Sequence, residues 1–418
     1  MKIYKFGGAS LKIPGNINTL IKIIKDEKDL ILVVSAIDKT TNALEKLIDA
    51  CFNNNYDKEE IFNKIKAFHY NYLNECFDFK CPINIVNDFE NIIQKLENIV
   101  HKTPDNDFDR FYDSIICFGE LLSSFIVSNS LKNKGINNNL IDVRKILFTD
   151  SNYRDAKILW EESENKLKNS GIVFSGITIL QGFIGEDKNG IPTSLGREGS
   201  DYTAAGLAYL LNAESVTIWK DVPGIMNADP SWCDFAEKLT EISYREAIEL
   251  AFYGAKVIHP KTIKPLENKS IPLYVKSFLN PYDNGTVVKK LNYKLNLVPV
   301  YILKENQILL SVSPKDFSFI VEENLSKIFS LFAQYKIKVN VMQNSAISFS
   351  VSIDGNNRYF EKLIEDLRQE FIVKYNSGLE LITIRYYTDK SIAKMTSGKR
   401  ILLEQKSRNT ARFVLEKF

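Results

Sequence analysis

The stretch Asp29-Leu30-Ile31-Leu32-Val33-Val34-Ser35 decides the fold class of this chain. Its five central residues form a short, continuous apolar run, which is typical of a strand buried on both faces of a parallel sheet. Similar strand signals lie at residues 3–6 and 215–219, and an apolar, Ala-rich helical pattern lies at residues 200–211. Strands that alternate with helices in this way predict an α/β domain, with a mainly parallel sheet sandwiched by helices.

The chain of 418 residues is too long for one average domain. The alternating pattern breaks at residues 281–286, which are rich in Pro, Asp, Asn and Gly, so we place a domain boundary near residue 295. Within residues 1–295, the polar and helical stretch 52–112 predicts a helical layer or lid beside the sheet.

Residues 296–418 follow a different pattern. Residues 305–376 show the order strand, helix, strand, strand, helix, strand, which predicts a small α+β, ferredoxin-like module. Residues 380–418 begin a second module of this kind but are too few to complete it. We therefore expect the second module to take a strand from residues 298–304 or from a partner chain.

The overall composition excludes several classes of protein. With 54 basic and 52 acidic residues the net charge is only +2, so nucleic acid is a poor candidate partner. No apolar run approaches the 18 or so residues of a membrane helix, and the N-terminus does not resemble a signal peptide. Five cysteines without a C-x-x-C pair are typical of reduced thiols in a cytoplasmic protein, and three scattered histidines make a zinc site improbable.

The sequence also lacks the common phosphate-binding and hydrolase motifs. There is no G-x-x-x-x-G-K-[ST] loop, no G-x-G-x-x-G fingerprint, no H-R-D or D-F-G set and no G-x-S-x-G elbow. Walker-type ATPases, dinucleotide-binding folds, protein kinases and α/β-hydrolases are therefore not indicated.

Two glycine-containing turns could bind an anion. Lys5-Phe6-Gly7-Gly8 closes the first strand, and ligands of open parallel sheets bind outside the carboxyl ends of strands. Ser194 to Asp201 is a second such turn and runs into the helix at residues 200–211, whose N-terminus favours anions. The alternatives stay open here, because the first motif also fits a plain turn and Asp201 also fits a helix cap.

Glu120 is a carboxylate in an otherwise apolar helical segment. A buried carboxylate needs a partner. That partner is either a structural Lys or Arg, or the amino group of a ligand, and the sequence alone does not choose between them.

These signals are weak one by one, but their order and spacing together resemble the aspartate kinases of the amino-acid kinase family. The motifs that carry the resemblance are Lys5-Phe6-Gly7-Gly8-Ala9-Ser10, Ser35-Ala36 with Lys39-Thr40-Thr41-Asn42, Gly119-Glu120, Gly182-Phe183-Ile184-Gly185, Leu195-Gly196-Arg197 through Asp201-Tyr202, Trp219 to Gly224 with Asp229-Pro230, and Gly254 to Pro260. The resemblance covers essentially the full chain, since the C-terminal modules look like the paired ACT regulatory domains of those enzymes.

The resemblance implies that ATP phosphorylates the β-carboxylate of L-aspartate to give 4-phospho-L-aspartate, the first step toward lysine, threonine and methionine. It implies catalytic roles for Lys5 and Asp201, with Glu120 bound to the substrate α-ammonium and Arg197 to its α-carboxylate. The implied aspartate-binding residues are Ser35, Thr41, Glu120, Phe183, Arg197 and Ser200. The implied nucleotide-binding residues are Lys5, Gly7, Gly8, Ser10, Lys220, Asp221, Met226, Ser231 and Lys256.

The same resemblance implies ATP with Mg²⁺ as cofactor, the metal being held mainly by phosphates and water rather than by a protein site. It also implies a cytoplasmic homodimer joined through the ACT domains, with lysine or threonine as a possible effector near Met342, Ser345 and Ala346. We expect no fused homoserine dehydrogenase module.

Several positions depart from the pattern of the family. Met226 replaces a common Tyr, Ser231 a common basic residue, and Glu198 a common Gly. Ala346 stands where a Glu often sits in lysine-sensitive relatives. Nucleotide affinity and the response to lysine are therefore the properties we expect to differ.

Two alternative functions remain. One is an amino-acid kinase that acts on another carboxylate, such as glutamate, although Gly119-Glu120 with paired ACT modules would not be expected there. The other is a catalytically silent ACT-type amino-acid sensor, against which Lys5, Glu120, Arg197 and Asp201 argue together.

Overall fold

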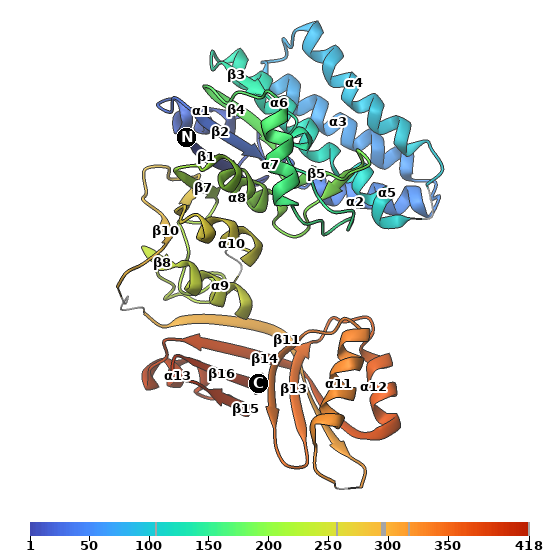
Figure 1. Ribbon diagram of the computed structural model, residues 1–418, viewed down its shortest axis with the longest axis vertical. Helices are drawn as coiled ribbons and strands as arrows, with labels where there is room; N and C mark the ends of the chain where they lie inside the picture. Colours follow the sequence, from blue (N-terminus) through green and yellow to red (C-terminus); the bar gives the residue numbers. More distant parts are fainter. Residues whose placement is uncertain (105–106, 256–257, 294–297, 317, 417–418) are drawn as a thin grey trace. The chain divides into compact units, whose positions relative to one another are not determined.

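The computed structural model describes residues 1–104, 107–255, 258–293, 298–316 and 318–416 (Figure 1). The chain divides into two compact units. The first unit comprises Met1–Ile225, Lys238–Ile248 and Lys256–Tyr293. The second unit comprises Met226–Glu237, Glu249–Ala255 and Lys294–Phe418, so two short segments from before residue 293 belong to it.

The first unit is built on a sheet of eight strands in the order β3-β4-β2-β1-β7-β9-β10-β8. All neighbouring pairs are parallel except β9 and β10. Every residue of β2, Leu30–Val34, is buried, and because successive side chains of a strand point to opposite faces, helices must cover both faces of the sheet. The predicted α/β fold class is confirmed.

The strands of this sheet are β1 (Lys2–Phe6), β2 (Leu30–Val34), β3 (Asn138–Leu140), β4 (Ile177–Gln181), β7 (Ser215–Lys220), β8 (Glu241–Ser243), β9 (Leu273–Ser277) and β10 (Thr286–Lys289), and a separate hairpin is formed by β5 (Ile184–Glu186) and β6 (Pro192–Ser194). The helices around it are α1 (Asn16–Ile24), α2 (Thr40–Phe52), α3 (Lys58–Cys76), α4 (Ile83–Val100), α5 (Phe108–Ile116), α6 (Phe118–Asn133), η1 (Val143–Lys145), α7 (Trp160–Asn169), α8 (Gly199–Leu211), α9 (Tyr244–Tyr253) and α10 (Pro260–Asn268).

The register of the central strands positions the site. Phe6 at the end of β1 pairs with Val34 of β2 on one side and with Trp219 of β7 on the other. The carboxyl ends of these three parallel strands therefore lie side by side. The glycine turn after β1, Ser35 after β2 and Lys220 at the end of β7 consequently share one edge of the sheet.

The helical stretch Phe108–Asn133, which contains α5 and α6, is long and apolar enough by composition to span a membrane. The sequence analysis predicted an apolar helical segment around Glu120 but found no apolar run as long as a membrane helix. Of its most apolar window 78% is buried inside the protein, because α6 packs against β2, β3 and β4. A buried core helix passes the same test of length and composition, so the stretch is weak evidence for a membrane span.

The second unit contains a sheet of six strands in the order β12-β13-β11-β14-β16-β15. The strands β11 and β14 are each 15 residues long and run through both halves of this sheet (Figure 1). The elements of the unit are β11 (Val300–Pro314), α11 (Glu322–Gln334), β12 (Val339–Asn344), β13 (Phe349–Asp354), α12 (Phe360–Glu370), β14 (Phe371–Arg385), α13 (Asp389–Thr396), β15 (Arg400–Lys406) and β16 (Thr410–Glu416).

Each half of this sheet has its own hydrophobic core. In the first half, α11 and α12 pack on β11, β13 and the start of β14, around Phe332 and Leu363. In the second half, Ile382 and Phe413 pack with Ala228 and Cys233 from the segment Met226–Glu237. Among the described elements, the second half of the sheet has only one helix of its own, α13. The segment Met226–Glu237 therefore adds apolar side chains to the core of this half.

Candidate active site

A pocket of about 640 Å³ lies in the first unit, where the sheet presents its carboxyl edge. This is the location at which open α/β sheets bind their ligands. Ten of the predicted site residues line the pocket: Lys5, Gly8, Ser35, Thr41, Glu120, Phe183, Arg197, Ser200, Asp201 and Lys220.

Asp201 lies at the centre of the charged groups. Its side chain is almost fully buried, and the distance from its Oδ1 to Lys5 Nζ is 2.6 Å. Its Oδ2 lies 3.5 Å from Lys220 Nζ. Burial alone would raise the pKa of Asp201, but the two ammonium groups outweigh it and hold the pKa below its usual range. Asp201 is therefore an ionised carboxylate that positions two lysines, and it is not a helix cap, because the N-cap of α8 is Glu198.

Gly8 allows the turn after β1 to approach the end of β2. A Cβ atom at Gly8 would lie 2.3 Å from the carbonyl oxygen of Ala36, a distance that no side chain tolerates. Gly7 lies beside the lysine, since a Cβ atom there would be 3.7 Å from Lys5 Nζ. Ser10 is turned away toward β7, where its hydroxyl donates to the carbonyl of Trp219.

Glu120 lies in the first turn of α6 and is buried, with 4% of its surface exposed. Burial raises the pKa of Glu120 to about 8, and the N–H of Ala36, which donates to its Oε1 at 3.4 Å, counteracts this only in part. No side-chain cation pairs with Glu120 in the described part of the chain. The structure thus favours the second alternative, a carboxylate whose partner arrives with a ligand.

The hydroxyl of Ser35 is a second polar group of the pocket, and it has no partner among the described residues. Its Oγ is buried against the pocket and has no hydrogen-bond partner among the described residues. Buried hydroxyls normally have a hydrogen-bond partner, so the Ser35 hydroxyl can bond a polar group that enters the pocket.

Part of the lining of this pocket has a strained backbone. Four non-glycine residues that line it have left-handed φ angles: Asp38 (48°), Arg154 (68°), Phe183 (69°) and Glu198 (55°). Each such residue costs on the order of 1–2 kcal/mol, so the surrounding structure must impose the conformation. At Glu198 the side chain contributes, because its Oε2 accepts the N–H of His259 at 2.8 Å.

The structure also reveals a buried carboxylate beside the pocket that the sequence analysis missed. Asp113 of α5 is fully buried, and its Oδ2 accepts the N–H groups of Ser194 (2.8 Å) and Arg154 (3.0 Å). Its Oδ1 accepts the hydroxyl of Ser194 at 2.5 Å. The signal was present, because Asp113 is an acid between apolar helical residues just as Glu120 is, but its partners lie 41 and 81 positions away in the chain.

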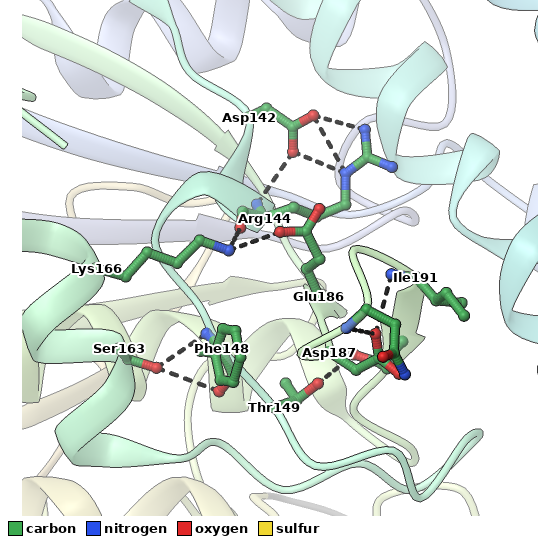
Figure 2. Close-up of polar contacts among 11 residues, drawn as sticks. Asp142, Arg144, Phe148, Thr149, Ser163, Lys166, Glu186, Asp187 and Ile191 are labelled. Atoms are coloured by element: carbon green, nitrogen blue, oxygen red, sulfur yellow. Dashed lines mark hydrogen bonds and ion pairs between the residues drawn. The ribbon is translucent and has the colours of Figure 1, made fainter. Parts of the chain in front are cut away.

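A network of polar contacts holds the loop that carries Arg154 against the β5–β6 hairpin (Figure 2). Figure 2 shows Asp142 paired with Arg144, and Lys166 donating both to the carbonyl of Arg144 and to Glu186 of β5. Thr149 donates its N–H to the carbonyl of Glu186 at 2.9 Å. The loop is thereby joined to the β5–β6 hairpin, which leads into the turn before α8.

The remaining predicted nucleotide-binding residues are Asp221, Met226, Ser231 and Lys256. Asp221 follows β7 in an exposed turn and is not among the residues that line the pocket. Met226 and Ser231 belong to the second unit. Lys256 lies outside the described residues, and its predicted role stays a prediction.

The predicted regulatory residues lie at one end of the second unit. Met342 is half exposed on β12, which is an edge strand of the sheet. In the turn that follows, Ser345 shares a hydrogen bond with the Ser348 hydroxyl at 2.7 Å, and the carbonyl of Ala346 accepts the N–H of Ile320 at 2.9 Å.

No group of three or more His, Cys, Asp or Glu side chains that could hold a metal ion occurs in the described part of the chain. The central carboxylate, Asp201, is already paired with two lysines. The donor set of this pocket therefore fits a metal that is carried by a ligand's own oxygens rather than by the protein.

The family model of the amino acid kinase family matches residues 1–277. The chain belongs to the amino acid kinase family. Its predicted resemblance to aspartokinases is also confirmed by curated relatives. The chain is 29% identical to lysine-sensitive aspartokinase 3 of Escherichia coli over 394 residues, which covers 91% of this chain and 86% of that protein.

A second relative of this amino acid kinase is longer. The chain is 32% identical over 396 residues to the bifunctional aspartokinase/homoserine dehydrogenase of Buchnera aphidicola, and the match covers 91% of this chain but 47% of that protein. The chain thus spans about half the length of that relative. Among solved structures, E. coli aspartokinase III in complex with aspartate and ADP has a TM-score of 0.82 at 26% identity, covering 99% of this chain and 96% of that chain.

Proposed function

We propose that this chain is an aspartate kinase, which transfers the γ-phosphoryl group of ATP to the β-carboxylate of L-aspartate and forms 4-phospho-L-aspartate and ADP. The observation that carries the proposal is the ion-paired cluster of Lys5, Asp201 and Lys220 at the glycine turn, in which Lys5 and Asp201 are buried. Beside it lies a buried Glu120 that pairs with no side-chain cation among the described residues. The solved relative with aspartate and ADP supports nucleotide and aspartate as the two ligands.

The chemistry of the pocket fits this reaction. A carboxylate is ionised at neutral pH and attacks without a general base, so positioning and charge neutralisation carry the catalysis. Lys5 and Lys220, held by Asp201, would place positive charge where negative charge spreads over the transferring oxygens. The N–H groups of Gly7 and Gly8 would hold phosphate oxygens, as glycine turns at strand ends do.

The amino-acid end of the pocket would be formed by Glu120, Ser35, Thr41, Phe183, Arg197 and Ser200. Glu120 would bind the substrate ammonium, and Arg197 would bind its α-carboxylate. The orphaned hydroxyl of Ser35 would gain its missing partner from the substrate. Mg²⁺ would enter with the nucleotide, held by phosphate oxygens and water, and would supply further charge neutralisation when bound.

Regulation belongs to the second unit in this proposal. The described sheet has β12 and β15 at its edges, and we propose that two chains form a homodimer through these C-terminal sheets. Lysine or threonine is the proposed effector class, supported by a solved relative in complex with lysine and aspartate. The cytoplasm is the expected compartment.

The decisive experiment is a coupled trap assay. Purified full-length chain is incubated with Mg-ATP, hydroxylamine and either L-aspartate or L-glutamate, and the acyl hydroxamate is measured. We expect aspartyl hydroxamate. Product from glutamate alone would favour the kinase of another carboxylate, and no product from either would favour the silent sensor.

A further inference from the structure

Arg154 is a cation of the same pocket to which the proposed mechanism assigns no role. It lies in the loop between η1 and α7, lines the pocket, and leaves 46% of its side chain exposed. Neither its neighbours in sequence nor its spacing from the glycine motifs indicates that Arg154 is a site residue. Its position in the pocket follows only from the fold.

The guanidinium of Arg154 is held in one place by α5. Its NH1 group donates to Asp109 at 2.9 Å, and the group stacks over the ring of Tyr112 at 4.6 Å from the centroid and over Phe108 at 5.5 Å. An arginine has five N–H donors in a planar fork. The bond to Asp109 is its only side-chain hydrogen bond within the described residues, so donors remain for an anion.

The backbone of Arg154 is held as firmly as its side chain. Its φ of 68° is costly for any residue with a side chain. The buried carboxylate of Asp113 imposes this conformation, because it accepts the N–H of Arg154 while it also binds Ser194. Strain that is imposed by a buried group at a pocket is a sign of a functional position.

Two contacts place Arg154 at the amino-acid end of the pocket. Tyr112, on which the guanidinium stacks, donates its hydroxyl to Glu45 at 2.8 Å, and Glu45 lies one helical turn after Thr41 on α2. On the other side, a Cβ atom at Gly196 would lie 3.1 Å from the carbonyl oxygen of Arg154, so the arginine backbone abuts the residue before Arg197.

We propose that Arg154 binds the substrate together with Arg197, as a second guanidinium for the carboxylate that does not react. Arg154 is then a specificity-determining residue, because it selects amino acids that carry a free α-carboxylate. The inference rests on the proposed function, in which the side-chain carboxylate is the one that is phosphorylated. A forked guanidinium suits this task because it donates two parallel hydrogen bonds to one carboxylate.

The test compares two substrates that differ only at the α-carboxylate: L-aspartate and L-aspartic acid α-amide. The variant Arg154→Gly removes the guanidinium and suits the left-handed backbone. We expect kcat/KM for L-aspartate to fall by about tenfold, as for a lost charge-assisted hydrogen bond, while kcat/KM for the amide and KM for ATP change less than about twofold. An equal loss for both substrates, or no loss for either, would overturn the proposal.

Two further variants separate substrate binding by Arg154 from a purely structural role of its ion pair with Asp109. Arg154→Gln keeps the side-chain length without the charge and should show the same loss of discrimination. Asp109→Asn removes the ion pair but keeps the guanidinium, so KM for aspartate should stay equal or fall. If KM for aspartate rises as much in Asp109→Asn as in Arg154→Gly, the proposal is contradicted. That result would show that only the ion pair with Asp109 matters.

Failure of the proposed function has a different signature. If the wild-type chain phosphorylates glutamate instead of aspartate, the same comparison is made with glutamate and its α-amide. If the wild-type chain forms no acyl phosphate, binding of L-aspartate and of its α-amide is measured by calorimetry in wild type and Arg154→Gly. The proposal then requires that only the aspartate affinity falls.

Discussion

Lys5 and Asp201 form a buried ion pair, with 2.6 Å between the lysine Nζ and the carboxylate Oδ1, although they stand 196 positions apart in the chain. Since β1 and β7 are paired neighbours, Lys220 also reaches this carboxylate. One buried acid thus sets the position of two lysines, which is how a pocket concentrates positive charge in a chain whose net charge is only +2.

Removing either member of this pair should abolish most of the catalysis. Lys5→Ala and Asp201→Ala should each lower kcat by about 10²-fold or more, because each takes away a placed charge in a buried site. Steady-state kinetics with Mg-ATP and aspartate measures this. Lys64→Ala is the matched control, since Lys64 is exposed in a surface pair with Glu60 and its loss should leave kcat unchanged. Near wild-type turnover in either pocket variant would show that the assigned role is wrong.

Glu120 should make stability depend on pH in a defined direction. Burial raises the pKa of Glu120 to about 8, so the folded state holds a proton that the unfolded state releases near pH 4 to 5. Its contribution to stability therefore falls as pH rises to about 8. Glu120→Gln should raise Tm relative to wild type at pH 8.5 but hardly at pH 5, while KM for aspartate rises about tenfold or more. A Tm difference that does not grow with pH would contradict this assignment.

Asp113 permits a comparison of two substitutions at one buried site. Burial raises the pKa of Asp113 to about 6, so ionising it in the folded state costs about 3 kcal/mol above that pH. Asp113→Asn keeps an oxygen for the two N–H groups and an amide for the Ser194 hydroxyl. It should therefore raise Tm at pH 7.5 and keep the activity.

The matched variant Asp113→Ala leaves the N–H groups of Ser194 and Arg154 without an acceptor. It should lower the free energy of unfolding by about 2–4 kcal/mol and raise KM for aspartate. Chemical denaturation and kinetics of both variants measure this difference. Equal stability of the Asn and Ala variants would show that the hydrogen bonds of Asp113 do not hold the loop.

Glu198 should affect nucleotide binding more than stability. Glu198→Gly relieves a left-handed φ of 55° but loses the hydrogen bond to His259, and these effects are each about 1 kcal/mol and opposite in sign. Tm should change by less than about 3 °C. KM for ATP should fall a few-fold, because the substitution removes a negative charge from the lining of the pocket that we propose receives the nucleotide phosphates. A higher KM for ATP would reverse this interpretation.

The proposed dimer and effector site can be tested without substitutions. Light scattering at micromolar concentration should give about twice the monomer mass of 47.9 kDa. Of the pathway amino acids, at least one of lysine and threonine should raise Tm, since a ligand that binds only the folded state stabilises it. A monomer at this concentration would contradict the dimer, and no shift with either amino acid would contradict the effector site.

The glycine motifs and the capping signals were readable from the sequence because they are local. The stretch Ser243-Tyr244-Arg245-Glu246, for example, matches the capping-box pattern, and the Ser243 side chain accepts the N–H of Glu246 at the start of α9. The pocket residues near these motifs, such as Lys5 and Asp201, could be predicted from their order along the chain. Asp113 and Arg154 could not, since their contacts join α5, a long loop and β6 across 41 and 81 positions.

By itself, the sequence determined the α/β class, the order of the motifs and the identity of the charged groups, because these depend on hydrophobic period and on turns a few residues long. Only the tertiary structure decided that Glu120 meets no side-chain cation in the described residues, that Asp201 binds two lysines, and that Met226–Glu237 packs with the second unit. The physical reason is that burial and charge pairing depend on which distant segments the sheet register brings together. No local stretch of sequence determines that register.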